Sequence, residues 1–174
     1  MEEKENLNAL KVALDNEMQE REFYLKNAER TKNPIGKAMF NQIAEEELEH
    51  YERLKELHER WTRNETWPET VPLKVNDTIV KDVLKDSVKQ VDAMPEKDDD
   101  DLKAIRIAID FESKGASRYA KLREDVSDPK EKEFFNLLAN IEHEHYVSLK
   151  DTEEYLTDPA SWYTKTERHG LDGA

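Results

Sequence analysis

Apolar residues recur at spacings of three and four along four long stretches of the chain, which is the period of an amphipathic α-helix. The first stretch covers about residues 5–30, and the second covers about residues 34–61 and begins at a proline suited to a first helical turn. The third follows the acidic run 98–101, and the fourth runs from Asp128-Pro129 to Asp158-Pro159. The short turn within each pair predicts two antiparallel helix hairpins.

The segment that joins the hairpins, residues 62–97, interrupts this period. Trp67-Pro68 and Val71-Pro72 predict extended backbone, because the residue before a proline avoids the helical region. Residues 78–94 then have the pattern of a shorter amphipathic helix. We expect this helix to lie in the crossover, either against the bundle or against a partner subunit.

The two hairpins have related sequences. Residues 7–60 align with residues 102–155 without a gap, and 20 of the 54 aligned positions are identical. Unrelated acidic helical sequence would give only about four or five identities. A shared helical period alone would not align proline, tyrosine and asparagine, so a duplicated hairpin is the stronger interpretation. Matched pairs include Tyr24/Tyr119, Pro34/Pro129, Phe40/Phe135, Asn41/Asn136 and Leu54/Leu149.

The repeat also carries the candidate chemistry. A lone glutamate precedes a Glu-x-x-His motif by 30 residues in each copy, and the motif places a carboxylate and an imidazole one helical turn apart. All four glutamates lie on or beside the apolar stripes, where an unpaired carboxylate is costly to bury. A pair of metal ions is the simplest common partner for these four carboxylates. The predicted ligands are Glu17, Glu47, His50, Glu112, Glu142 and His145.

This ligand set suits two ions of iron or manganese, with zinc as a further option. In a four-helix bundle the glutamates of the two Glu-x-x-His motifs, Glu47 and Glu142, can bridge both ions. Glu17 and Glu112 would then bind one ion each from the facing helices, and each histidine would supply one nitrogen.

Several neighbouring residues have two interpretations. Tyr24 and Tyr119 lie two turns beyond the lone glutamates, where they could hydrogen-bond ligand carboxylates or serve as ordinary aromatic core. Glu20 could be an extra ligand, although a solvent-exposed position is the favoured interpretation. The acidic run 98–101 suits a helix start and is expected to be a solvated loop, with a surface cation site as the lesser option. Residues expected to lie on the surface or outside the site are Glu46, Glu49, Glu144, His58, His143 and His169.

Composition limits the class of protein. The 174 residues are enough for one all-α domain, here residues 1–156, followed by a tail 157–174 whose Trp162 and Tyr163 pack down before a frayed end. The absence of cysteine excludes disulfides and Cys-ligated iron or zinc. A formal charge of −14 argues against nucleic acid and anionic membrane as partners. No apolar run is long enough to span a bilayer, so we expect a cytoplasmic protein.

These motifs resemble the ferritin-like diiron-carboxylate superfamily, and within it the rubrerythrin group. The resemblance covers about residues 5–156 and rests on Glu17 with Tyr24, Glu112 with Tyr119, and the two Glu-x-x-His motifs. It implies a four-helix bundle with a long crossover, a homodimer, and a di-iron centre that reacts with hydrogen peroxide or dioxygen.

Two departures from the rubrerythrin pattern stand out. Rubrerythrins carry a cysteine-built rubredoxin-like domain, and without cysteine this chain would require an external electron-donor protein. They also carry an extra glutamate one turn after the lone glutamate of the third helix, where this chain has Gly115. The matching position of the first helix holds Glu20. In rubrerythrins the extra glutamate is associated with a redox-linked exchange of metal ligands, and the resemblance implies that Glu20 would take this role here.

The leading hypothesis is therefore a non-haem di-iron peroxidase of rubrerythrin type, re-reduced by an external donor protein. Three alternatives remain: a ferroxidase or iron-handling protein that reacts with dioxygen, a di-manganese enzyme that dismutates peroxide as a catalase does, and a metal-binding bundle without catalysis.

Overall fold

The computed structural model describes residues 2–63, 75–90 and 98–171, with side chains for residues 6–63, 75–90 and 98–166. Within these ranges the chain forms six helices and no strand. Their bounds are α1 Glu2–Arg30, α2 Pro34–Thr62, α3 Val80–Lys89, α4 Asp99–Asp125, α5 Pro129–Thr157 and α6 Pro159–Leu171.

Both hairpins start their second helix by the same local device. Asn33 and Asp128 are N-caps whose side-chain oxygens accept hydrogen bonds of 2.8–3.1 Å from backbone N–H groups two and three residues further on. Pro34 and Pro129 occupy the first helical position, where no N–H group is needed. The predicted helix starts are thus confirmed.

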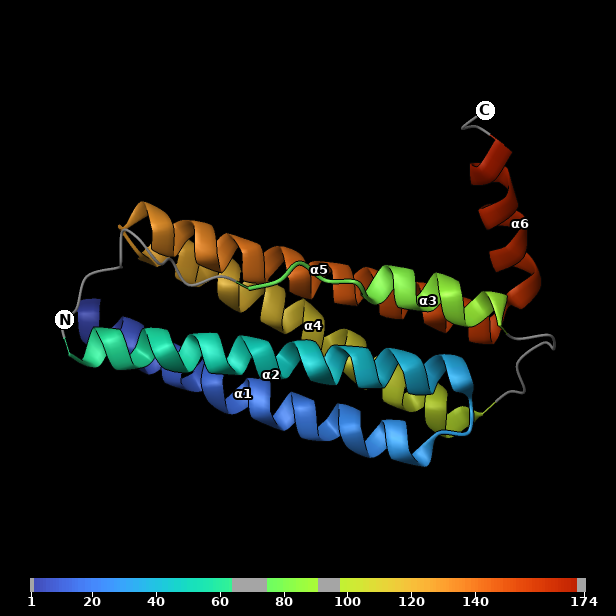
Figure 1. The fold of residues 1–174 in the computed structure, drawn as a ribbon, viewed down its shortest axis with the longest axis horizontal. Coiled ribbons are helices and arrows are strands. Elements are labelled where there is room, and N and C mark those ends of the chain that lie inside the picture. The colour runs from blue at the N-terminus through green and yellow to red at the C-terminus, as the bar shows by residue number, and fades with distance from the viewer. Residues whose placement is uncertain (1, 64–74, 91–97, 172–174) are drawn as a thin grey trace.

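The four long helices form a bundle of two hairpins (Figure 1). Helix α1 packs along α2 and α4 packs along α5, while contacts between α1 and α4 and between α2 and α5 join the hairpins. The predicted all-α, ferritin-like four-helix bundle with a long crossover is confirmed. No described helix is both long enough and apolar enough to cross a membrane.

The crossover helix α3 is shorter than predicted. It covers residues 80–89, and Thr78 and Ile79 precede it because the Thr78 hydroxyl accepts a hydrogen bond from the backbone N–H of Val80 at the helix start. It lies against α2 and α5 of its own chain (Figure 1). The proline breaks at 67–68 and 71–72, and residues 91–94 at the expected helix end, lie outside the described residues.

The expected tail is a helix, which corrects the prediction for residues 159–171. Pro159 ends α5, but it also occupies the first position of α6, as the prolines of α2 and α5 do. Figure 1 shows α6 turning away from the bundle axis. Trp162 and Tyr163 pack edge-on against the ring of Tyr155, as expected. The side chain of His169 lies outside the described residues.

The acidic run at the start of α4 is partly buried. Asp98 is the N-cap, and Asp99 and Asp100 are exposed as expected. Asp101 is buried instead, and it accepts hydrogen bonds from Arg30 at 2.9 Å and from the Thr31 hydroxyl at 2.5 Å. The solvated-loop interpretation is wrong for Asp101, whose carboxylate ties the start of α4 to the end of α1.

The apolar core consists of two clusters, one toward each end of the bundle. Tyr24 and Phe40 belong to one cluster, and Tyr119 and Phe135 belong to the other. The middle turns of the helices therefore lie between two layers that exclude water. The spacing shared by the two copies of the repeat places the candidate ligands on those turns.

Candidate metal centre

All six predicted ligands are brought together in the middle of the bundle. Helices α1 and α4 each contribute one glutamate, and α2 and α5 each contribute a glutamate and a histidine one turn apart. Each of the six side chains is at most 1% exposed: Glu17, Glu47, His50, Glu112, Glu142 and His145.

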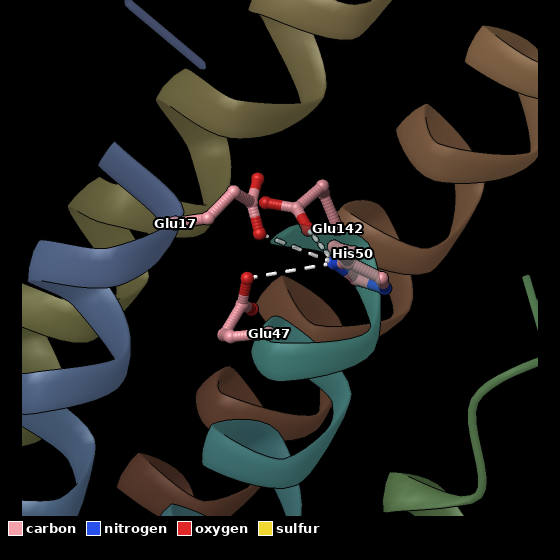
Figure 2. Close-up of side chains that lie close together, drawn as sticks. All are labelled: Glu17, Glu47, His50 and Glu142. Atoms are coloured by element: carbon pink, nitrogen blue, oxygen red, sulfur yellow. Dashed lines mark ion pairs between the residues drawn. The ribbon is translucent and has the colours of Figure 1, made fainter. Parts of the chain in front are cut away.

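One group of ligands surrounds His50. Its Nδ1 lies 3.4 Å from Glu17 Oε2, 3.4 Å from Glu47 Oε2 and 3.3 Å from Glu142 Oε1. Figure 2 shows these four side chains, which come from α1, α2 and α5, pointing toward one another. Their candidate ligand atoms all lie within 4.8 Å of one another, so the group could hold one metal ion.

A second group surrounds His145. The Nδ1 atom of this histidine lies 3.2 Å from Glu112 Oε2 and 3.5 Å from Glu47 Oε1, and Glu142 completes the group. The two groups share Glu47 and Glu142, the two glutamates for which a bridging position was predicted. The imidazole rings of His50 and His145 lie nearly parallel, with centroids 6.1 Å apart.

The donor atoms fit a cationic occupant. Both carboxylate oxygens of Glu47 and Glu142, one oxygen of Glu17 and Nδ1 of His50 are buried without a hydrogen-bond partner among the described residues. Buried charges without partners are costly, and carboxylate oxygens with imidazole nitrogens form a ligand set typical of divalent iron, manganese or zinc. The geometry therefore supports metal binding at these two groups.

Without a cation the cluster must hold protons. Burial and the neighbouring carboxylates raise the pKa of Glu47 well above its ordinary value and raise the pKa of Glu142 to about 8. Burial alone would lower the pKa of each histidine, but the surrounding carboxylates raise the pKa of His50 and of His145 well above the usual range. Burial alone would raise the pKa of Glu17, but hydrogen bonds and the charge of His50 lower it to about 2.

The two tyrosines reach across the bundle to the lone glutamates. The hydroxyl of Tyr24 on α1 donates to Glu112 Oε1 on α4, and the hydroxyl of Tyr119 on α4 donates to Glu17 Oε1 on α1. The structure favours the hydrogen-bonding interpretation of these residues, since each hydroxyl donates to the carboxylate of a predicted ligand while its ring packs in an apolar cluster.

Glu20 is buried, so the favoured solvent-exposed interpretation is wrong. Its side chain lies one turn beyond Glu17 and is 5% exposed, with Oε2 lacking a hydrogen-bond partner among the described residues. Burial, together with the charges of Glu17, Glu142 and Glu112, raises the pKa of Glu20 to about 9. It belongs to neither four-residue group, but it lies beside both.

Gly115 occupies the position of α4 that matches Glu20 in the repeat. A Cβ atom there would overlap Glu142 Oε2 and would lie 3.1 Å from Glu142 Cδ. The carboxylate of Glu142 thus occupies the space in which a side chain at position 115 would begin. This contact gives a physical reason for the difference between the two copies of the repeat.

Glu46 contacts the site, which the sequence did not predict. It was expected on the surface, yet its Oε2 lies 2.6 Å from His145 Nε2 and its side chain is only 12% exposed. Glu49 and Glu144 are half-buried and His143 is exposed, and none of these three belongs to either ligand group. The signal for Glu46 was weak, because its partner lies on the other hairpin.

Comparison with known proteins identifies the family. No curated protein and no solved structure gives a significant match. The model of the family described as Rubrerythrin matches residues 8–153. This match covers nearly all of both copies of the repeat and includes all six candidate ligands. With most of its length matched, the chain belongs to the rubrerythrin family.

Proposed function

We propose that this protein is a non-haem di-iron oxidoreductase that reduces hydrogen peroxide with electrons from an external donor protein. The observation that carries the proposal is the pair of buried four-residue groups that share Glu47 and Glu142. Membership of the rubrerythrin family supports iron as the metal.

In this proposal one ion would be held by Glu17, Glu47, Glu142 and His50, and the other would be held by Glu112, His145 and the two shared glutamates. A bound pair of Fe²⁺ ions would supply two electrons, which together with two protons convert hydrogen peroxide to two molecules of water, and the donor protein would then re-reduce the two Fe³⁺ ions. Glu20 Oε2, buried beside the groups without a partner, offers a further carboxylate to the same centre.

The remaining side chains prepare this site. The Tyr24 and Tyr119 hydroxyls hold the carboxylates of Glu112 and Glu17 in place, which limits how far these ligands can turn. The apolar clusters on both sides exclude water, so interactions within the centre are stronger than in solvent. Because the 174 residues contain no cysteine, they cannot build a rubredoxin-type centre, and the donor is proposed to be a separate protein.

The test begins with metal analysis of protein purified without added metal, for which we expect iron at about two ions per chain. Glu47→Ala and Glu142→Ala should each lose most of that metal, because each removes a ligand shared by both groups. Glu45→Ala is the matched control, since Glu45 is exposed on the same helix and should retain full metal content.

Anaerobic Fe²⁺-loaded protein is then mixed with hydrogen peroxide and, separately, with dioxygen. We expect rapid stoichiometric oxidation by peroxide and slow oxidation by dioxygen. The reverse order would replace the proposal with ferroxidase activity. Native manganese with peroxide dismutation would replace it with a catalase-like reaction, and retention of metal in both alanine variants would show that the site is misassigned.

A further inference from the structure

Glu46 connects three parts of the molecule through one carboxylate. It precedes Glu47 on α2, and its Oε2 lies 2.6 Å from Nε2 of His145 on α5. Its Oε1 accepts hydrogen bonds from the side-chain amide of Gln42 at 2.8 Å and from the backbone N–H of Ile79 at 3.2 Å. Ile79 is the N-cap residue of α3, so the same carboxylate touches a candidate ligand and the start of the crossover helix.

The contact at Nε2 decides how His145 presents its other nitrogen. A carboxylate accepts hydrogen bonds and donates none when ionised, so Nε2 must carry the proton. An imidazole that binds metal is neutral and has only one N–H group, so a proton held at Nε2 leaves the lone pair of Nδ1 for the metal. Nδ1 faces Glu112 Oε2 at 3.2 Å, inside the second ligand group. Glu46 therefore selects the form of His145 that can bind metal through Nδ1.

Within the described part of the chain, His50 has no equivalent of this contact. In the register of the repeat, position 46 matches Ile141, which is buried on α5. Among the described residues, the carboxylates that pair with His50 all do so at Nδ1. The two ligand groups thus have nearly equivalent ligands, but they differ in whether a carboxylate contacts Nε2 of the histidine.

We propose that Glu46 is a positioning residue that holds His145 with Nδ1 directed into the metal centre and couples this orientation to the start of α3. The proposal rests on the metal centre of the proposed function. If one carboxylate serves both contacts, binding of metal at His145 stabilises the hydrogen bond to Ile79, and by linkage an ordered crossover strengthens metal binding.

The chain offers a matched control at Glu49, one turn beyond Glu46 on α2. Glu49 Oε1 also holds the crossover, accepting hydrogen bonds from the backbone N–H of Asn76 at 3.1 Å and from its side-chain amide at 3.0 Å. Among the described residues it belongs to neither ligand group, and both of these hydrogen bonds come from Asn76. Loosening the crossover at Glu49 therefore leaves the support of His145 intact.

The experiment compares wild type, Glu46→Ala, Glu46→Gln and Glu49→Ala, using Zn²⁺ as a diamagnetic probe. Affinity is measured by competition with a chromogenic chelator. We expect roughly a tenfold or greater loss for Glu46→Ala, the usual effect of removing a partner of a ligating histidine. Glu46→Gln keeps the size of the side chain but cannot accept hydrogen bonds through both of its terminal atoms. This variant should therefore also lose affinity for Zn²⁺. Glu49→Ala should stay within about twofold of wild type.

Two spectroscopic readouts separate positioning from general destabilisation. In Zn²⁺-loaded wild type, ¹H–¹⁵N spectra should show a slowly exchanging Nε2–H of His145, which Glu46→Ala should lose and Glu49→Ala should keep. Zn²⁺ should also slow hydrogen exchange at the amides of Ile79 and the first turn of α3 in wild type, but not in Glu46→Ala.

Equal affinity loss in Glu46→Ala and Glu49→Ala would overturn the proposal, because a loosened crossover would then explain both. Unchanged affinity in Glu46→Ala beside normal binding by wild type would overturn the role of Glu46 alone. If wild-type protein binds none of Zn²⁺, Fe²⁺ and Mn²⁺, the assignment of the metal centre is overturned, and this inference is overturned with it.

Discussion

At Gly115, helix α4 leaves room for the carboxylate of Glu142, whose Oε2 an added Cβ atom would overlap. Glu142 belongs to both candidate ligand groups, so its displacement would disturb both. We expect Gly115→Ala to lower the affinity for Zn²⁺ by roughly tenfold or more, comparable to the loss of a supporting contact at a metal site. Competition with a chromogenic chelator measures this effect.

Gly36 provides the control for that substitution. It lies in the first turn of α2, where the nearest atom to an added Cβ would be the Thr31 hydroxyl oxygen at an ordinary 3.6 Å. Gly36→Ala should leave metal affinity unchanged and should raise the free energy of unfolding by about 0.5–1 kcal/mol, because alanine favours the helix. Wild-type affinity in Gly115→Ala would contradict the steric argument.

Glu20 makes the stability of the metal-free protein depend on pH. Its pKa is about 9 in the fold and 4.5 ordinarily, so between these values the folded state binds an extra proton. The free energy of unfolding therefore falls as pH rises across this range. Glu20→Gln removes that loss and should stabilise the metal-free protein by about 3 kcal/mol at pH 7.

Urea unfolding of chelator-treated protein at several pH values tests this expectation, with Glu22→Gln as the control because Glu22 is exposed on the same helix. The Glu20 variant should show a shallower decline of stability between pH 5 and pH 9 than wild type or the control. Parallel curves for all three proteins would mean that Glu20 ionises normally in the fold.

At the scale of helices, polar contacts between α1 and α4 join the two hairpins. The two tyrosine–glutamate bonds lie in the middle of the bundle, and the Arg30–Asp101 ion pair lies where α1 ends and α4 begins. Because Asp101 is buried, removing its charge leaves the Thr31 hydroxyl and the guanidinium of Arg30 with a weaker acceptor.

We expect Asp101→Asn to lower the free energy of unfolding by about 1–3 kcal/mol, the usual effect of disrupting a buried hydrogen-bonded group. Asp100→Asn is the matched control, since Asp100 is the exposed neighbour in the same first turn and should change stability by less than about 0.5 kcal/mol. Chemical denaturation of both variants gives the comparison. Equal stabilities would show that the ion pair contributes nothing to hairpin docking.

Features that repeat along a helix, and the tyrosine–carboxylate contacts that the duplication carries, were predictable from the sequence. Contacts between hairpins that the repeat does not duplicate were not. The spacing of Glu47 and His50 determines a shared helix face, so the ligand cluster followed from local geometry. Glu46 lies on a different side of α2, and its contact depends on where α5 places His145. The burial of Glu20 likewise depends on the packing of α1 against the neighbouring helices, which a single helix does not reveal.

Helix α6 begins at a local signal that has two meanings. Asp158-Pro159 predicts a helix end, yet Asn33-Pro34 and Asp128-Pro129 have the same form and start helices. An Asx–Pro pair can both end one helix and start the next, because proline lacks the N–H group that a helix interior needs but a first turn does not.

At the scale of the whole molecule, charge and burial act together. The chain carries a formal charge of −14, and its four candidate ligand glutamates are fully buried. Two divalent ions bring four positive charges, which would reduce the formal charge to −10 (−14 + 4) if no proton were released. The raised pKa values of Glu47, Glu142 and both histidines indicate that protons hold part of this charge in the metal-free fold.

Metal binding should therefore release protons. Carboxylate and imidazole ligands bind metal in their deprotonated forms, and the raised pKa values keep several of them protonated at neutral pH. We expect Zn²⁺ affinity to rise with pH between about 6 and 8, with at least one proton released per chain at pH 7. Calorimetric titration in two buffers of different ionisation enthalpy counts those protons. Affinity that does not change with pH would mean that the cluster is already deprotonated in the metal-free fold, with its charge balanced by some other buried cation.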